Sequence, residues 1–215
     1  MTLRFPLAAL AILASSFATA PQARPVTYAG GHVLVLSHQP TLDQWRYTHS
    51  PSFRWSVSVG GLRADHLGET QSLDVDYLRA ARLLHRWNLP EAQANAFLWG
   101  GIGQTRSGKG DGLGRHVGLQ LDYETRRIYT ALVSELHEGD GWSHRFDTVM
   151  LGWSPHPHDV DRMASWVVLK GMHTSNTDDS RLKGALVLRF FTTRWWLEAG
   201  ADEDGRPLAN LMVNF

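Results

Sequence analysis

The sequence predicts an all-β fold, an antiparallel up-and-down barrel of 10–12 strands, and three observations support it. Apolar and polar residues alternate with a period of two over most of the chain from about residue 30 onward, as expected for strands. Most of the connections between these segments are polar and rich in glycine. The chain also ends inside an alternating segment, "PLANLMVNF", rather than in a polar tail.

The N-terminus predicts an export signal. Arg4 supplies the positive end, residues 5–17 form an apolar core, and small residues suited to cleavage follow. We expect cleavage after Ala18 or Ala20. The apolar run is shorter than the roughly 20 residues that a membrane-spanning helix needs. The segment up to Ala20 is therefore predicted to be a signal peptide, and residues 21–215 a single domain outside the cytoplasm.

The composition excludes several classes of function. The 215 residues contain 21 basic and 21 acidic side chains, and this balance gives no reason to expect a nucleic-acid partner. The chain has no cysteine, which excludes disulfides, thiolate metal sites and a lipid anchor on an N-terminal cysteine.

Four segments show the strand pattern most clearly: "FRWSVSVGG", "RHVGLQLDY", "LKGALVLRFF" and "RWWLEAGAD". Weaker alternation marks further strands near residues 30–37, 42–48, 73–87, 93–105, 127–137, 145–153 and 163–173. By propensity alone, 73–87 is also compatible with a helix. We interpret it as a strand because its charged residues share one parity.

The last strand has a complete apolar face of Ala209, Leu211, Val213 and Phe215. In a closed barrel the last strand pairs with the first and no edge remains, so a chain can end within the sheet. Tryptophans lie at the predicted strand ends on one level, at positions 55, 87, 153 and 195, joined there by Phe190 and Phe215. Aromatic residues concentrate where a bilayer meets water, so this level predicts a transmembrane barrel with both termini in the periplasm.

The chain resembles bacterial outer-membrane β-barrel proteins, in which an aromatic last residue after alternating apolar positions is read by the assembly machinery. Leu211, Val213 and Phe215 match this signal. "NLPEAQANAFLWGGIG", "YETRRIYT", "LGWSPHPHD" and "RWWLEAGADEDGRPLANLMVNF" resemble a poorly characterised group of small proteobacterial outer-membrane proteins, often encoded near copper or heavy-metal handling genes. The resemblance implies an outer-membrane location, with membrane lipid and the barrel assembly machinery as partners. It supplies no catalytic residue.

The face opposite the lipid face is predicted to carry charges of both signs into the lumen. These residues are Arg54, Asp74, Asp76, Arg82, Arg86, Asp122, Arg127, Glu135, Lys183, Arg189, Arg194 and Glu198. One interpretation is an ion-pair network that fills a narrow interior. The other is a polar pathway for a small ion or solute, since about twelve strands enclose some water whereas about eight are filled by side chains.

One histidine cluster is a candidate metal site. "SPHPHDVDRM" holds His156, His158, Asp159 and Asp161, and imidazole with carboxylate suits copper or zinc. The alternative is a solvated turn, because the spacing of two histidines is weak evidence without a fixed third ligand. No other cofactor is predicted.

Catalysis is not expected. Ser134, Glu135 and His137 are the nearest set to a nucleophile and base, but Ser134 and His137 have opposite parity and would lie on opposite sides of the wall. The predicted function is therefore a non-enzymatic outer-membrane barrel with a narrow or closed pore, linked to copper tolerance or envelope integrity. The alternatives are a soluble periplasmic barrel that binds a small apolar ligand and a lipid-modifying outer-membrane enzyme.

Overall fold

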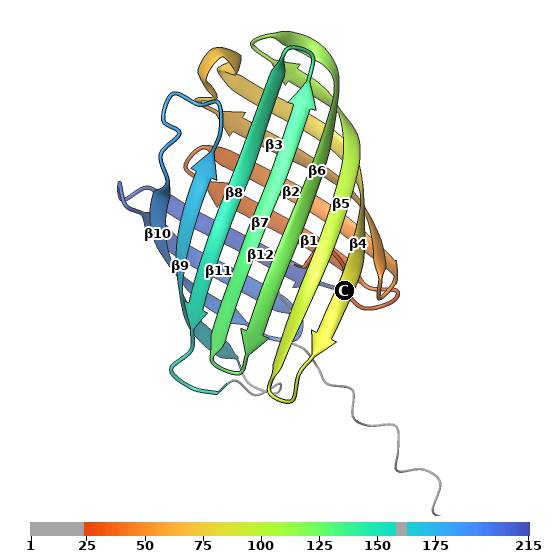
Figure 1. Ribbon diagram of the computed structural model, residues 1–215, viewed down its shortest axis with the longest axis vertical. Coiled ribbons are helices and arrows are strands. Elements are labelled where there is room, and N and C mark those ends of the chain that lie inside the picture. Colours follow the sequence, from red (N-terminus) through yellow and green to blue (C-terminus); the bar gives the residue numbers. More distant parts are fainter. Residues whose placement is uncertain (1–23, 158–162) are drawn as a thin grey trace, which may run out of the picture.

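The computed structural model describes residues 24–157 and 163–215, which form one closed barrel of twelve antiparallel strands (Figure 1). The strands are β1 (His32–Gln39), β2 (Leu42–Ser52), β3 (Trp55–Asp65), β4 (Ser72–Asn88), β5 (Ala92–Ser107), β6 (Gly110–Thr125), β7 (Ile128–Gly139), β8 (Trp142–Trp153), β9 (Ala164–Thr174), β10 (Lys183–Phe191), β11 (Trp195–Asp202) and β12 (Pro207–Asn214). The predicted fold class is confirmed. The predicted signal peptide lies outside the described residues.

Each strand pairs with its neighbours in sequence, and β12 pairs with β1 to close the sheet. In this seam Leu36 lies opposite Leu211 and Leu34 opposite Val213. The backbone N–H of Phe215 donates to the carbonyl of His32 at 2.9 Å, and that of His32 donates back at 3.3 Å. The last residue is therefore held in the sheet, as the terminal alternation predicts.

The two ends of the barrel are named here after some of their connections. One end, here called the loop rim, carries residues 66–71, which include the 3₁₀ turn η1 (Gly68–Thr70), and residues 175–182. The other end, the turn rim, carries the tight connections at 53–54 and 126–127. Among the described residues, no helix is long and apolar enough to cross a bilayer.

The segment with ambiguous propensity, residues 73–87, lies within the strand β4. Leu73, Val75 and Tyr77 of this strand are buried inside the barrel. The register with β5 shifts between Leu83 and His85, which marks a bulge. Because a bulge adds one residue on one strand, it reverses which parity faces inward beyond that point.

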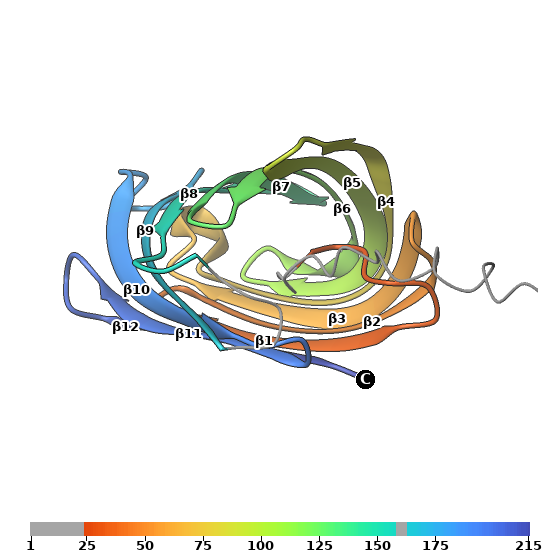
Figure 2. The same ribbon diagram turned by 90° about the horizontal axis from the view of Figure 1, so that it is seen from below.

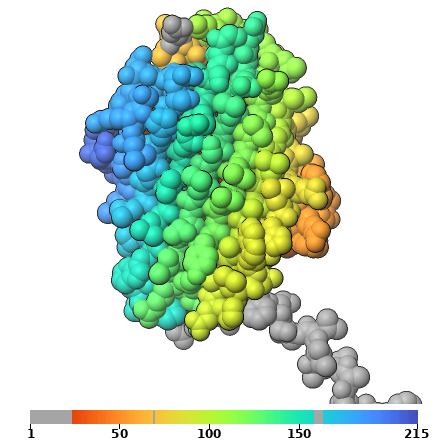
Figure 3. Space-filling view, in the orientation of Figure 1, coloured from red at the N-terminus to blue at the C-terminus, as the bar shows by residue number. Residues whose placement is uncertain are grey.

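The outer face of the wall is apolar. Val57, Leu169, Leu186 and Leu188 are each at least half exposed, whereas their inward neighbours such as Val168 and Val187 are fully buried. Figure 3 shows this outer surface over the strands from β4 to β10. Viewed along the barrel, the cross-section is flattened, with one long wall of β1, β2, β3, β11 and β12 (Figure 2). The apolar side chains thus cover the outside of the barrel.

Aromatic residues gather at the turn rim on the outer face. Trp55 begins β3 and Trp153 ends β8, and both have about half of their surface exposed, at 45% and 54%. Trp87 lies near the end of β4, and Phe215 ends the chain with 63% exposure. These side chains lie on one level, as the sequence pattern predicts.

The seam predicts a specific cross-link. Val33 and Asn214 are register partners next to the hydrogen-bonded pair of His32 and Phe215, so their Cα atoms form the closer kind of antiparallel pair, about 4.5 Å apart. That spacing permits a disulfide. The Val33→Cys/Asn214→Cys variant should oxidise nearly completely and run as a circular chain on a denaturing gel without reductant. Val33→Cys/Leu208→Cys, out of register, should stay linear, and cross-linking of both variants alike would contradict the seam.

Candidate functional site in the barrel lumen

A cavity of about 180 Å³ lies at the centre of the lumen and is lined by charged side chains from six strands. These are Arg46 of β2, Arg79 of β4, Glu135 of β7, Lys170 of β9, Arg189 of β10 and Glu198 of β11. Each alternates with an outward apolar or small residue on its strand, so the period of two places them inside. The cavity is the candidate functional site.

The Glu198 cluster forms one side of the cavity. The Glu198 carboxylate is fully buried and accepts hydrogen bonds from the Arg189 guanidinium at 2.9 and 2.7 Å. It also accepts from the Lys170 ammonium and, at 2.9 Å, from the Asn210 amide. One carboxylate therefore serves two cations.

The Glu135 cluster forms the other side. The Arg79 guanidinium pairs with the Glu135 carboxylate, which is also 2.8 Å from Nε2 of His137. Arg79 Nε donates to His116 Nε2 at 3.1 Å, so that nitrogen of His116 carries no proton and the ring is neutral. Arg79 also lies over the rings of Tyr77 and Trp99 at 4.9 and 5.3 Å.

Two glycines leave room for this cluster. A Cβ on Gly118 would lie 2.2 Å from the indole of Trp99, and one on Gly101 would lie 2.4 Å from the ring of His116. The aromatic rings therefore pack directly on the backbone of β6 and β5. This close approach requires glycine at both positions.

Arg46 differs from the other cations of the cavity. Its Nε is buried and has no hydrogen-bond partner. The Tyr77 hydroxyl is a polar neighbour of its guanidinium, but none of the ion pairs within residues 24–157 and 163–215 involves Arg46. The indole nitrogens of Trp99 and Trp196, which line the same cavity, are also buried without partners.

Residues 24–27 form a floor under the cavity on the side of the turn rim, here called the N-terminal floor. Arg24 donates to Glu124 at 3.2 Å and to Gln93 at 3.1 Å. The carbonyl of Pro25 accepts from Ser56 at 2.5 Å, and Pro25 lines the central cavity. Val26 is buried against the apolar cluster that includes Phe97 and Trp99. The segment is therefore packed inside the barrel.

The floor rests on a third polar cluster, around Asp122. Its carboxylate accepts from Asn95 at 2.6 Å and from Gln120 at 2.9 Å. Asn95 in turn accepts from Arg86 at 2.7 Å, and Arg24 lies 4.0 Å from Asp122. The two carboxylates of this cluster, Asp122 and Glu124, are thus matched by Arg24 and Arg86.

A second cavity, of about 390 Å³, opens at the loop rim. The Asp179 carboxylate of the β9–β10 loop accepts from Lys183 at 3.1 Å and pairs with Arg181 at 3.2 Å. The hydrogen bond from Lys183 lowers the pKa of Asp179 below its usual value. Salt bridges of Arg181 to Glu203 and Asp204 tie this loop to the β11–β12 turn. The cavity forms a charged vestibule.

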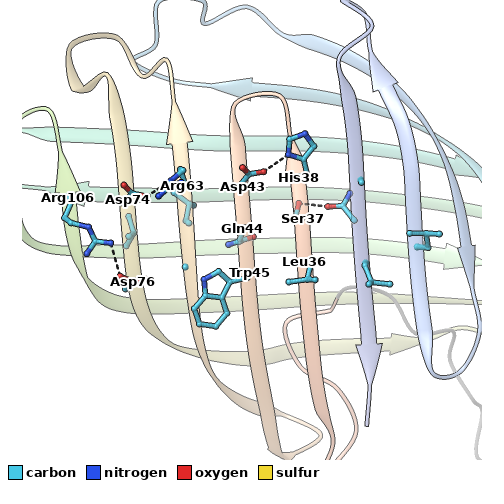
Figure 4. Close-up of a pocket in the computed structure, with 17 residues that line it drawn as sticks. Leu36, Ser37, His38, Asp43, Gln44, Trp45, Arg63, Asp74, Asp76 and Arg106 are labelled. Carbon is cyan, nitrogen blue, oxygen red and sulfur yellow. Dashed lines mark hydrogen bonds and ion pairs between the residues drawn. The ribbon is translucent and has the colours of Figure 1, made fainter.

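Another hollow, of about 560 Å³, lies on the long wall and is lined by residues of β1 to β5, β11 and β12 (Figure 4). Its polar pairs are Arg63 with Asp74 at 2.8 Å, Arg106 with Asp76 at 3.1 Å and His38 with Asp43 at 2.6 Å. Several of these side chains are exposed on the outer face, together with Trp45. This hollow is a groove in the outer wall, and Ser37, Gln44 and Asn210 line both the groove and the central cavity.

The structure places the twelve predicted lumen charges in three locations. Arg86, Asp122, Glu135, Lys183, Arg189 and Glu198 point into the lumen or its vestibule. Asp74, Asp76 and Arg82 lie instead on the outer face, where Arg82 lies over the ring of Trp55. Arg54, Arg127 and Arg194 lie exposed in turns. The expectation is corrected for these last two groups, because the odd-numbered residues of β4 face inward up to the bulge after Leu83 and because turn residues have no lumen face.

Other lumen residues have no counterpart among the predicted site residues. Arg46, Arg79, Lys170 and Asn210 lie in alternating segments, and Arg79 shares the parity of Leu73, Val75 and Tyr77. When the alternate positions of a strand are otherwise apolar, a single charged residue among them is a usable signal for a lumen residue. Arg24 precedes the first strand and has no periodic pattern to identify it.

The predicted metal cluster remains a prediction. His156 is exposed and its carbonyl accepts from Ser154 at 2.6 Å, whereas His158, Asp159 and Asp161 lie outside the described residues. Within residues 24–157 and 163–215, no three His, Asp or Glu side chains are arranged to hold a metal.

The serine considered for catalysis lies on the outer face. Ser134 donates to Asp147 at 2.6 Å, whereas His137 lies in the lumen against Glu135. The two side chains therefore lie on opposite sides of the wall, as their parity predicts. They form no nucleophile and base pair.

No protein-family model and no curated protein sequence matches the chain. Solved structures similar to it include the KdgM porin in complex with disordered oligogalacturonate, at 9% identity and a TM-score of 0.48, over 86% of this chain and 96% of that chain. Another is Pseudomonas aeruginosa OccK11 (OpdR), at 10% identity and a TM-score of 0.40, over 86% of this chain and 66% of that chain. At these values the similarity carries no argument about function.

The Glu198 cluster predicts a large loss of stability when its carboxylate is removed. Glu198→Gln leaves Lys170 and Arg189 buried without a counter-charge, which should cost about 3–5 kcal/mol in the free energy of unfolding. Glu138→Gln, which removes an exposed pair with Arg115, should cost about 1 kcal/mol or less. Urea titration in lipid vesicles, followed by tryptophan fluorescence, measures both. If the two variants lose the same free energy of unfolding, the Glu198 cluster does not stabilise the barrel wall.

Proposed function

We propose that this chain is a non-enzymatic, integral outer-membrane β-barrel with a narrow polar lumen that the N-terminal floor closes at rest. The single observation that carries the proposal is that the barrel is apolar outside and polar inside, the reverse of a soluble protein. Apolar side chains such as Leu186 and Leu188 cover the outside, and buried ion pairs such as that of Arg189 and Glu198 occupy the inside. Water would not favour this arrangement, whereas a bilayer requires it.

The same observation opposes the alternative of a soluble barrel with an apolar ligand inside. Such a barrel needs an apolar lumen and a polar outside. Here the central cavity is lined by charged residues, and Val57, Leu121 and Leu186 are exposed on the outer face. The aromatic level at the turn rim fits a membrane interface.

The lumen is closed because side chains and the N-terminal floor fill most of it. Although twelve strands enclose space, Trp99, Trp196 and the charged clusters leave only about 180 Å³ at the centre. Below it, Arg24 and Val26 are buried inside the wall. A solute that crosses the barrel must therefore pass the polar cavity and displace the floor. No cluster of the described residues favours a role in copper tolerance.

Membrane embedding predicts a position-dependent cost of charge. Leu119 lies mid-way along β6, and Leu119→Arg should cost about 2–4 kcal/mol of folding free energy in a bilayer. Leu113 lies on the same outer face near the loop rim, and Leu113→Arg should cost about 0–1 kcal/mol. Heat-dependent gel mobility after folding into vesicles measures the folded fraction. Equal costs at the two positions would rule out a bilayer around this face.

Closure by the floor predicts a conductance change. Arg24→Gln removes the charged contact with Glu124 and should raise the single-channel conductance in planar bilayers several-fold, because the floor loses its main polar anchor. Arg54→Gln removes the same charge from an exposed turn at the same rim and should leave the conductance unchanged. If Arg24→Gln conducts like the unaltered protein, the floor is not the barrier.

A further inference from the structure

We infer that the central cavity is a binding site for a small oxyanion, of the phosphate, sulfate or carboxylate type, with Arg46 as its principal ligand. The inference rests on the proposed function, because it needs the lumen to be reached from water. It goes further by assigning a ligand class to the lumen.

The first argument is the charge of the cavity. Four cations line it, but only two carboxylates, Glu135 and Glu198. Glu198 is shared by Lys170 and Arg189, and Glu135 pairs with Arg79. The other lumen carboxylates near the cavity, in the Asp122 cluster, are already matched by the arginines of that cluster. The cavity therefore has a surplus of positive charge.

The second argument is the guanidinium of Arg46, which forms none of the ion pairs of the described residues. Glu135 attracts this cation and Tyr77 is its hydrogen-bond neighbour, but its buried Nε has no acceptor. An anion in the cavity would supply that acceptor and a closer counter-charge. The planar guanidinium also suits the paired oxygens of a carboxylate or phosphate better than an ammonium does.

The third argument is the kind of atom left without a partner. Besides Nε of Arg46, the buried partnerless atoms at this cavity are the indole nitrogens of Trp99 and Trp196. All three are N–H donors, but the Trp99 nitrogen lies against the backbone of Gly118 and is not counted as a ligand. An oxyanion offers acceptors, so it complements the donors of Arg46 and Trp196, whereas a metal cation would be repelled by the guanidinium.

The size of the cavity limits the ligand. A volume of about 180 Å³ exceeds the roughly 30 Å³ that one water occupies in the liquid, so a small oxyanion fits with part of its hydration shell. Ser37, Gln44 and Gln120 provide further polar groups on the lining. A longer anionic chain would not fit while residues 24–27 form the floor.

The binding experiment uses the full-length mature protein folded in uncharged detergent micelles, with sodium phosphate and sodium sulfate titrated by calorimetry. The unaltered protein should bind at least one of the two anions. Arg46→Gln should weaken binding by about tenfold or more, because it removes the unpaired charge without leaving a carboxylate alone. Arg115→Gln, the same charge change on the outer face, should bind like the unaltered protein.

Two outcomes would overturn the inference: no binding of either anion by the folded protein, or equal binding by Arg46→Gln. Heat-dependent gel mobility of each sample shows first that the barrel has formed, so failure to fold in lipid or detergent is distinguished from failure to bind. In planar bilayers under a KCl gradient, the reversal potential of the Arg24→Gln variant should show anion preference. A preference for cations would also overturn the inference.

Discussion

The structure depends on closure of the sheet between β1 and β12. An open edge would expose unpaired backbone N–H and C=O groups, which a hydrocarbon environment does not tolerate. The paired hydrogen bonds between His32 and Phe215 remove that edge at the last residue of the chain. Once the sheet is closed, alternation assigns the strand residues to the outer face or to the lumen, and this assignment positions the charged clusters. The cavity, its surplus charge and the apolar outer belt therefore all follow from one seam.

Inside the closed wall, ion pairs replace the apolar core of a soluble domain. Each cluster links strands that are distant in sequence: Arg79 reaches from β4 to β7, and Lys170 reaches from β9 to β11. Buried pairs of this kind contribute little net stability compared with apolar packing, but removal of one partner is costly. The clusters thus fix the shape of the lumen more than they stabilise the fold. Aromatic rings beneath Arg79 and Arg189 hold the guanidinium planes in place.

The sequence predicts the fold well and the lumen only in part. A period of two and a terminal aromatic residue are local signals, so they predict a barrel of 10–12 strands and its closure. Alternation within a strand also predicts which alternate residues face inward, until a bulge switches them to the other set. In β4 the shift after Leu83 returns Arg86 to the lumen while Asp74, Asp76 and Arg82 remain outside. The floor could not be predicted for another reason. Arg24 donates to Glu124, which lies one hundred positions away in the sequence, and no periodic pattern connects the two residues.

The lumen elements differ in how readily they can move. A shift of the Glu198 or Glu135 cluster would separate buried charges that several strands hold together, and the sheet would have to distort with them. The N-terminal floor is a single short segment. Ser56 donates to the carbonyl of Pro25, the N–H of Thr27 donates to Ser50, and Arg24 donates to Glu124. These few contacts lie near the turn rim, where water can replace them. If the barrel opens, the physical cost is therefore lowest for release of the floor, and the basic cavity then opens towards the turn rim.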